Sequence, residues 1–313
     1  MPLKFNVTVL VMANIVLLFI CLFIGLGLRH LKAMPRDAHL ALNTVILYVP
    51  LPALILLNIP YLQWDVSLLT LCLVPWIIFA VSYLLFPMLG NKYGWEKSVV
   101  GCLILTAGLG NTAFVGYPVI EALYGKEALK HAILLDQPGT FLIASSMGIL
   151  VATLYSSGRM QKRVLARKVL FFPPFFAFSS AIILSLFGWT AVGDVAIILE
   201  KLSVVLTPLA LISVGLQLEW GEILRERKFL SIGLGFKLIF CPLIIFIVYR
   251  LIGLEEPLFK VAVMEAAMAP MITASIIAAS HNLQPRLAGM MVGVGVPLSF
   301  VTLSFWYFVL QSL

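Results

Sequence analysis

Long apolar runs separated by short polar segments make up most of this chain. Charged or turn-forming residues delimit ten of them: 6–28, 38–59, 66–90, 98–123, 130–156, 168–188, 196–218, 229–251, 257–281 and 286–310. A helix needs roughly 20 residues to cross the hydrocarbon core of a bilayer. The runs lack the two-residue alternation of barrel strands, so the pattern predicts an all-α membrane protein with ten transmembrane helices.

Composition points to the same class. Of the 313 residues, 62% are hydrophobic and only 11% are charged, against about 25% charged in an ordinary soluble domain. A soluble protein of this composition could not cover its own surface, which excludes a cytosolic globular enzyme, a nucleic-acid-binding protein and a disordered chain. We therefore expect the lipid bilayer as a partner and no nucleic acid. The cysteines are scattered singly, so no metal site is expected.

The basic residues indicate the orientation in the membrane. Most of the 21 lysines and arginines fall in the loops after runs 1, 3, 5, 7 and 9: Arg29, Lys32, Arg36, Lys92, Lys97, Arg159, Lys162, Arg163, Arg167, Lys168, Arg225, Arg227, Lys228 and Arg286. Because cytoplasmic loops carry an excess of Lys and Arg, these loops are predicted to be cytoplasmic. Both termini then lie outside, and the net charge of +7 reflects loop placement.

The most basic loop divides the runs into two sets of five. Residues 1–156 form the first five-helix repeat, 157–167 a cytoplasmic linker, and 168–313 the second repeat. Because each set contains an odd number of spans, the second set enters the membrane upside down relative to the first. This inverted repeat is typical of many secondary transporters.

The fourth run of each half is interrupted at a corresponding place. In the first half Gly110-Asn111 lies near the middle of the run, and in the second half Ala269-Pro270 does. Glycine lowers helix propensity and proline removes a backbone donor. Paired interruptions indicate a transporter binding site. The alternative is that Gly and Pro only allow close helix packing.

The chemistry of these breaks suits charged ligands. The N-terminus of a half-helix favours anions and its C-terminus favours cations. The Asn111 side chain can both donate and accept hydrogen bonds, and Thr112, Thr273 and Ser275 add hydroxyl groups. These residues, with the backbone of the two breaks, are candidate substrate contacts.

Three charged residues fall within the apolar runs: Asp136, Lys237 and Glu265. Such residues are costly in lipid and should face protein or water. Glu265 lies one turn before the second break, where its carboxyl could carry a proton or ligate sodium. Lys237 could neutralise either acid or meet an anionic substrate. Two alternatives stay open, a purely structural set of ion pairs and, for Asp136, snorkelling to the outer surface.

Several motifs resemble the auxin efflux carrier family, in order along nearly the whole chain. They are Leu109–Pro118 with Leu123-Tyr124-Gly125, Glu265–Pro285, Pro208–Leu218, Leu42-Asn43 with Pro50-Leu-Pro52, and Lys237-Leu238 with Pro242. The first of these is the most specific. The absence of a long central loop is similar to the short, bacterial-type members, for which a location in the bacterial inner membrane is implied.

The resemblance implies a fold shared with bile-acid and sodium/proton carriers, in which spans 4 and 9 cross at their unwound centres. It also implies a scaffold domain from spans 1, 2, 6 and 7 that carries a homodimer contact. A transport domain from spans 3–5 and 8–10 would move as an elevator. Members carry organic anions, such as auxin in plants and, as proposed for bacteria, malate or malonate.

Carried over residue by residue, the family's crossover asparagine matches Asn111. The chain departs from the plant pattern at two positions. Plant members have proline where this chain has Gly110, and their second crossover proline lies one position earlier than Pro270, where this chain has Ala269. Glu265 replaces an uncharged glutamine. These departures count against auxin itself as the substrate.

The candidate substrate site comprises residues from both breaks and one from span 5: Gly110, Asn111, Thr112, Gln137, Ala269, Pro270, Met271 and Thr273. The candidate ion- or proton-coupling residues are Asp136, Lys237 and Glu265. No cofactor is expected beyond a possible bound Na⁺ or H⁺.

The leading interpretation is thus a secondary transporter of small organic anions. The nearest alternative is a sodium-coupled symporter of the bile-acid carrier type, with Glu265 as a sodium ligand. An intramembrane enzyme is disfavoured because no HExxH, GxSxG or intramembrane aspartyl-protease motif is present. A channel or receptor is disfavoured because neither a pore-filter motif nor a soluble signalling domain is found.

Overall fold

The computed structural model describes residues 7–35, 37–61, 66–156, 173–217 and 223–312. The predicted linker at 157–167 and the beginning of the predicted sixth span lie outside these residues. Within the described residues all regular elements are helical, apart from one isolated antiparallel bridge between Gly110 and Pro270. The prediction of an all-α protein is confirmed at this level.

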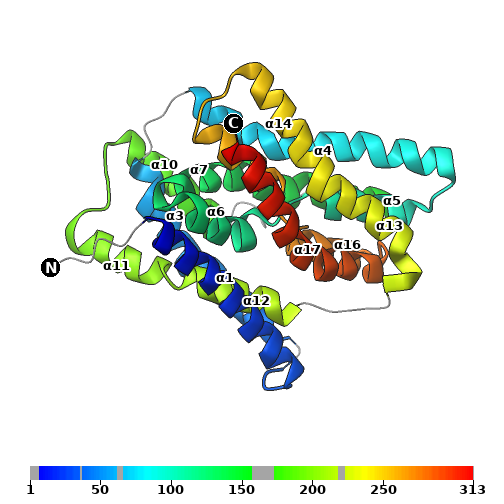
Figure 1. Ribbon diagram of the computed structural model, residues 1–313, viewed down its shortest axis with the longest axis horizontal. Coiled ribbons are helices and arrows are strands. Elements are labelled where there is room, and N and C mark those ends of the chain that lie inside the picture. The colour runs from blue at the N-terminus through cyan, green and yellow to red at the C-terminus, as the bar shows by residue number, and fades with distance from the viewer. Residues whose placement is uncertain (1–6, 36, 62–65, 157–172, 218–222, 313) are drawn as a thin grey trace. The chain divides into compact units, whose positions relative to one another are not determined.

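Contacts between residues divide the chain into two compact units (Figure 1). Unit 1 is built from Met1–Gln63, Ala113–Ile133 and Phe176–Leu218. Its helices, wholly or for most of their length, are α1 (Val7–His30), α2 (Ala38–Tyr48), α3 (Pro50–Asn58), α6 (Tyr117–Tyr124), α7 (Lys126–Leu135), α10 (Pro173–Leu186), α11 (Gly193–Ser203) and α12 (Leu206–Gln217).

Unit 2 is built from Trp64–Thr112, Leu134–Phe175 and Glu219–Leu313. Its α-helices are α4 (Val66–Tyr93), α5 (Lys97–Gly108), α8 (Ile149–Tyr155), α13 (Ile223–Gly235), α14 (Cys241–Ile252), α15 (Leu258–Ala266), α16 (Ile272–Ser280) and α17 (Pro285–Gln311). Three π-helical segments join them, at Asp136–Phe141, Ala144–Gly148 and Phe236–Phe240. A fourth π-helical segment, Thr112–Gly116, precedes α6.

Six helical stretches among the described residues are long and apolar enough to cross a membrane: Ala38–Tyr61, Leu68–Tyr93, Lys126–Tyr155, Gly193–Gln217, Arg227–Ile252 and Pro285–Gln311. They coincide with predicted spans 2, 3, 5, 7, 8 and 10. Predicted spans 4 and 9 are each interrupted, so neither contains one long helix. The remaining two overlap shorter apolar helices, at Val16–His30 and Pro173–Leu186. The count of ten spans stays a prediction.

Unit 1 contains a close crossing of α1 and α12, which run side by side (Figure 1). A Cβ atom on Gly25 would lie 2.2 Å from the Ile212 carbonyl oxygen, and one on Gly215 would lie 2.3 Å from the Leu22 carbonyl oxygen. Only glycine allows backbones to approach this closely, as in other small-residue helix crossings. Arg29 Nη1 donates to the Leu216 carbonyl near the end of α12.

In unit 2, α5 forms the centre of the packing, because every residue from Val99 to Gly108 is buried. Glycines also allow the close contacts at the C-terminal end of α5 and at Pro270. A Cβ on Gly108 would lie 2.3 Å from Ser82 Oγ of α4, and one on Gly295 of α17 would lie 2.7 Å from Pro270 Cδ. The two interruptions are therefore held tightly by continuous helices on either side.

Candidate functional site: the crossing of two interrupted helices

The helices of predicted spans 4 and 9 end where the sequence predicts. α5 ends at Gly108, and Leu109 then adopts an extended conformation, with φ −119° and ψ 127°. α15 ends at Ala266, and Met271 is extended before α16 begins at Ile272. A proline at position 270 has no N–H, and its ring would clash with the carbonyl four residues earlier if the helix continued. The residue before it is also biased towards extended geometry.

The two extended segments, residues 109–111 and 269–271, pair with each other; we call this pairing the crossing. The Asn111 N–H donates to the Ala269 carbonyl at 2.7 Å, and the Met271 N–H donates to the Leu109 carbonyl at 3.0 Å. Gly110 and Pro270 face each other between these bonds. In this position of an antiparallel pair neither residue donates to the other, so the missing N–H of Pro270 costs nothing here.

Asp136 is held beside the crossing by two hydrogen bonds. Its Oδ1 accepts from Thr112 Oγ1, and its Oδ2 accepts from Gln137 Nε2 at 2.7 Å. The side chain is only 3% exposed, so the alternative that it snorkels to the surface is wrong. It lies at the start of a π-helical segment, a distortion that is frequent at functional sites.

Lys237 is buried next to Gly110 of the crossing, in the π-helical segment Phe236–Phe240. Its Nζ donates to the carbonyl of Ala266, the last residue of α15, at 3.1 Å. An ammonium at this end of a helix is favourable because the carbonyl dipoles point towards it. A Cβ on Gly110 would lie 2.9 Å from the same Nζ, so the glycine leaves the space that the ammonium occupies.

Glu265 is 1% exposed, in the last turn of α15. Among the described residues, neither of its carboxyl oxygens has a hydrogen-bond partner, and no ion pair joins it to Lys237. Lys237 Nζ bonds instead to the carbonyl of the next residue, Ala266. The set of three is therefore not a closed network of ion pairs, because Lys237 bonds to a carbonyl and leaves the Glu265 carboxyl open.

The structure thus brings most of the predicted site residues together within unit 2. The backbones of Gly110, Asn111, Ala269, Pro270 and Met271 form the crossing. Thr112, Gln137, Asp136, Lys237 and Glu265 surround it as buried side chains. Thr273 differs from them only in that it is exposed, in the first turn of α16.

Two members of this neighbourhood are missed by sequence reasoning. Ala266 supplies the carbonyl that holds Lys237, and no residue type signals such a role because every residue carries a carbonyl. Thr140 lies four residues after Asp136, fully buried, and its hydroxyl has no partner among the described residues. Its helical spacing from Asp136 is the signal that could have found it.

Comparison with known proteins gives the family of the chain. A family model described as membrane transport protein matches residues 10–307. An uncharacterized transporter of Methanothermobacter thermautotrophicus is 29% identical over 295 residues, covering 93% of this chain and 95% of the relative. An uncharacterized transporter of Methanocaldococcus jannaschii is 25% identical over 306 residues, covering 95% and 98% respectively. The resemblance found in the motifs is confirmed, and the chain belongs to the membrane transport protein family, which is of the auxin efflux carrier type.

Proposed function

We propose that this multi-pass membrane transporter is a secondary carrier of small organic anions, namely carboxylates such as malate or malonate, or auxin-like acids. The observation that carries the proposal is the crossing itself. Two interrupted helices pair by reciprocal backbone hydrogen bonds, and buried charged groups lie beside the pair. Interrupted helices are where transporters place substrate and ions, because their ends offer unsatisfied backbone groups in the membrane.

The charged residues at the crossing favour a mechanism in which the anion binds together with a cation. Asp136, Lys237 and Glu265 are the buried charged side chains of the described residues. With Glu265 ionised, the three carry one net negative charge and repel a carboxylate. With Glu265 neutralised by a proton or by Na⁺, the net charge is zero, and Lys237 becomes available to attract the anion. This count supports coupling to H⁺ or Na⁺ through Glu265.

The larger architecture belongs to the same proposal. Ten spans form a five-plus-five inverted repeat in a plasma membrane, the bacterial inner membrane, with both termini outside. Spans 1, 2, 6 and 7 form a scaffold that mediates a homodimer, and spans 3–5 and 8–10 form a transport domain that moves as an elevator. Unit 2 gathers spans 3, 8, 9 and 10, which supports this division. The second half of span 4, however, falls in unit 1.

Thermal unfolding of the purified protein tests the substrate class and the site together. We would screen malate, malonate, succinate, lactate, indole-3-acetate and bile acids, each with and without sodium at two pH values. A ligand at 100 times its dissociation constant stabilises the folded state by about 2.7 kcal/mol. We expect at least one carboxylate to stabilise the wild-type protein and to lose its effect in Asn111→Ala, which should also abolish transport.

Asn91→Ala is the matched control, because Asn91 is exposed at the end of α4, away from the crossing. The unfolding temperature of each variant without ligand shows that it folds. If Asn111→Ala binds and transports like wild type, the site assignment is wrong. If no anion in the panel changes the unfolding temperature, the carboxylate class is wrong.

The open Glu265 carboxyl also favours a second candidate, a sodium symporter of the bile-acid carrier type. A carboxylate beside the C-terminal carbonyls of α15 presents the oxygen ligands that Na⁺ prefers, and no hydrogen-bond donor from the described part of the chain meets its own oxygens. Bile acids that stabilise the protein only with sodium, at constant pH, would favour this candidate over the small carboxylates.

A further inference from the structure

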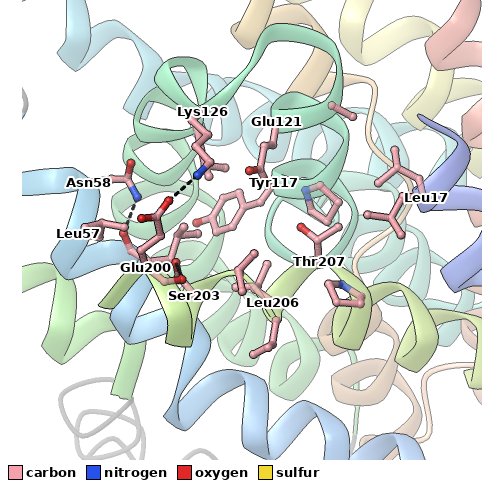
Figure 2. Close-up of a pocket in the computed structure, with 18 residues that line it drawn as sticks. Leu17, Leu57, Asn58, Tyr117, Glu121, Lys126, Glu200, Ser203, Leu206 and Thr207 are labelled. Atoms are coloured by element: carbon pink, nitrogen blue, oxygen red, sulfur yellow. Dashed lines mark hydrogen bonds and ion pairs between the residues drawn. The ribbon is translucent and has the colours of Figure 1, made fainter. Parts of the chain in front are cut away.

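Unit 1 contains a cavity of about 460 Å³, bounded by parts of α1, α3, α6, α7, α11 and α12 (Figure 2). This volume falls within the range of about 300–1,000 Å³ that is usual for small-molecule sites. Most of its lining is apolar, including Leu17, Leu54 and Leu206. None of the crossing residues lines it. The cavity therefore offers space for the apolar body of a second ligand.

The charged groups of the cavity do not balance. Lys126 Nζ donates to Glu200 Oε1 at 2.8 Å, and these side chains are 69% and 58% exposed, so the pair lies at the rim. Glu121 is half-buried, and it lines the cavity together with Thr207 (Figure 2). Among the described residues no ion pair is formed by Glu121. The lining thus holds one more carboxylate than ammonium.

An aromatic ring accompanies this unbalanced carboxylate. Tyr117 and Glu121 are four residues apart on α6, so they share one face of the helix, and both line the cavity (Figure 2). A carboxylate attracts an ammonium group by charge-assisted hydrogen bonding, and the Tyr117 side chain, which is 1% exposed, forms part of the wall beside it.

We propose that this cavity binds an amphipathic organic cation. Glu121 holds its ammonium group beside the Tyr117 ring, and the leucine and valine walls hold its apolar body. A carboxylate ligand of the kind proposed for the crossing would be repelled by Glu121 here. A neutral apolar molecule would leave the carboxylate without a counterion. The ligand class therefore differs in sign from the substrate proposed for unit 2.

Three probes that share one body and differ in their head group test this proposal: 1-adamantylammonium, 1-adamantanol and 1-adamantanecarboxylate. Their binding to the full-length purified protein is measured by calorimetry. We expect the ammonium compound to bind at least tenfold more tightly than the other two. In Glu121→Gln its affinity should fall about tenfold, because the charged partner is replaced by a neutral isostere of similar shape.

Glu127→Gln is the matched control. Glu127 lies on the neighbouring helix α7, pairs with Lys130 outside the cavity, and is 88% exposed; this change should leave ammonium binding as in wild type. Lys126→Gln gives a second test that does not depend on Glu121→Gln folding. It removes the resident cation from the rim and frees Glu200, so ammonium affinity should rise.

Equal binding of the three head groups, no binding of the ammonium probe, or unchanged affinity in both cavity variants would overturn the proposal. The ammonium could come from a soluble amine or from a lipid headgroup. In nanodiscs of phosphatidylglycerol with added phosphatidylethanolamine, competition with the probe would support a lipid source. Undiminished probe binding there would support a soluble amine.

Discussion

The two units each contain a crossing of helices at close range, and the two crossings are built differently. In unit 1, α1 and α12 pass each other as unbroken helices at Gly25 and Gly215. In unit 2 the helices themselves are interrupted, and the chain crosses as paired extended segments with Lys237 and Glu265 beside them.

The difference shows what a broken helix adds to close packing. Glycine alone is enough to bring two backbones together, as at Gly215. At Gly110 the space made by the missing side chain is taken by the Lys237 ammonium instead of a second helix. Glycine thus serves close packing in both units, and at Gly110 in unit 2 it also leaves room for a buried ammonium group.

The largest expected effect on stability comes from Gly215→Ala, which disrupts the close contact between α1 and α12. Its Cβ would lie 2.3 Å from the Leu22 carbonyl oxygen, a backbone atom that cannot move independently. We expect a loss of about 1–3 kcal/mol in the free energy of unfolding, as for other overpacked sites. Ligand affinity of the folded protein should not change, which denaturant unfolding and calorimetry together would show.

Gly27→Ala is its control on the same helix, because a Cβ there meets nothing within 4 Å. An equal loss of stability in the two variants would mean that helix propensity or the general surface, and not the α1–α12 crossing, sets the cost.

An intermediate effect is expected from Glu265→Gln at the polar crossing. The amide is neutral at all pH values, so it imitates the protonated carboxyl without releasing a proton. In wild type, carboxylate affinity should rise as pH falls, by up to tenfold per pH unit or about 1.4 kcal/mol, because protonation removes the repelling charge. In the variant this dependence should vanish.

Binding titrations between pH 5 and 8 measure this dependence, and Glu96→Gln at the exposed start of α5 is the control. A variant that keeps the wild-type pH and sodium dependence would remove Glu265 from the coupling role.

The smallest effect is expected from Gly110→Ala. The new Cβ would lie 2.9 Å from Lys237 Nζ, but this is the end of a flexible side chain, which can move aside. Stability should fall by less than about 1 kcal/mol, while substrate affinity falls several-fold because the Lys237 bond to Ala266 is disturbed. Gly289→Ala, with open space around its Cβ, is the control for calorimetry. Unchanged affinity would show that the position of the ammonium does not matter.

The sequence predicts the parts of the crossing that are local in the chain. The missing N–H of Pro270 and the weak helix propensity around Gly110 predict both interruptions. The high free energy of a charged side chain in lipid predicts that Asp136, Lys237 and Glu265 face the protein interior. The register is not local, because the pairing of Asn111 with Ala269 depends on how distant helices pack. For the same reason sequence could not show that Lys237 bonds to a carbonyl instead of Glu265.

Thr273 shows what residue type alone cannot predict. Its hydroxyl and its position after the break made it a candidate, yet helical rotation from Met271 to Ile272 and Thr273 turns it out of the buried group. A shift of one residue along a helix changes the direction of a side chain by about 100°. Residue type predicts candidates, and the start of α16 decides which of them face inward.

The antiparallel bridge at Gly110 and Pro270 also contributes to the free energy needed to separate the two paired segments. Two backbone hydrogen bonds fasten the crossing, and each contributes a net stabilisation of about 0.5–1.5 kcal/mol. Opening the buried crossing would also leave backbone N–H and C=O groups unsatisfied, at a cost of about 1–3 kcal/mol for each group. A ligand that opened the crossing would therefore have to replace these hydrogen bonds with its own polar groups.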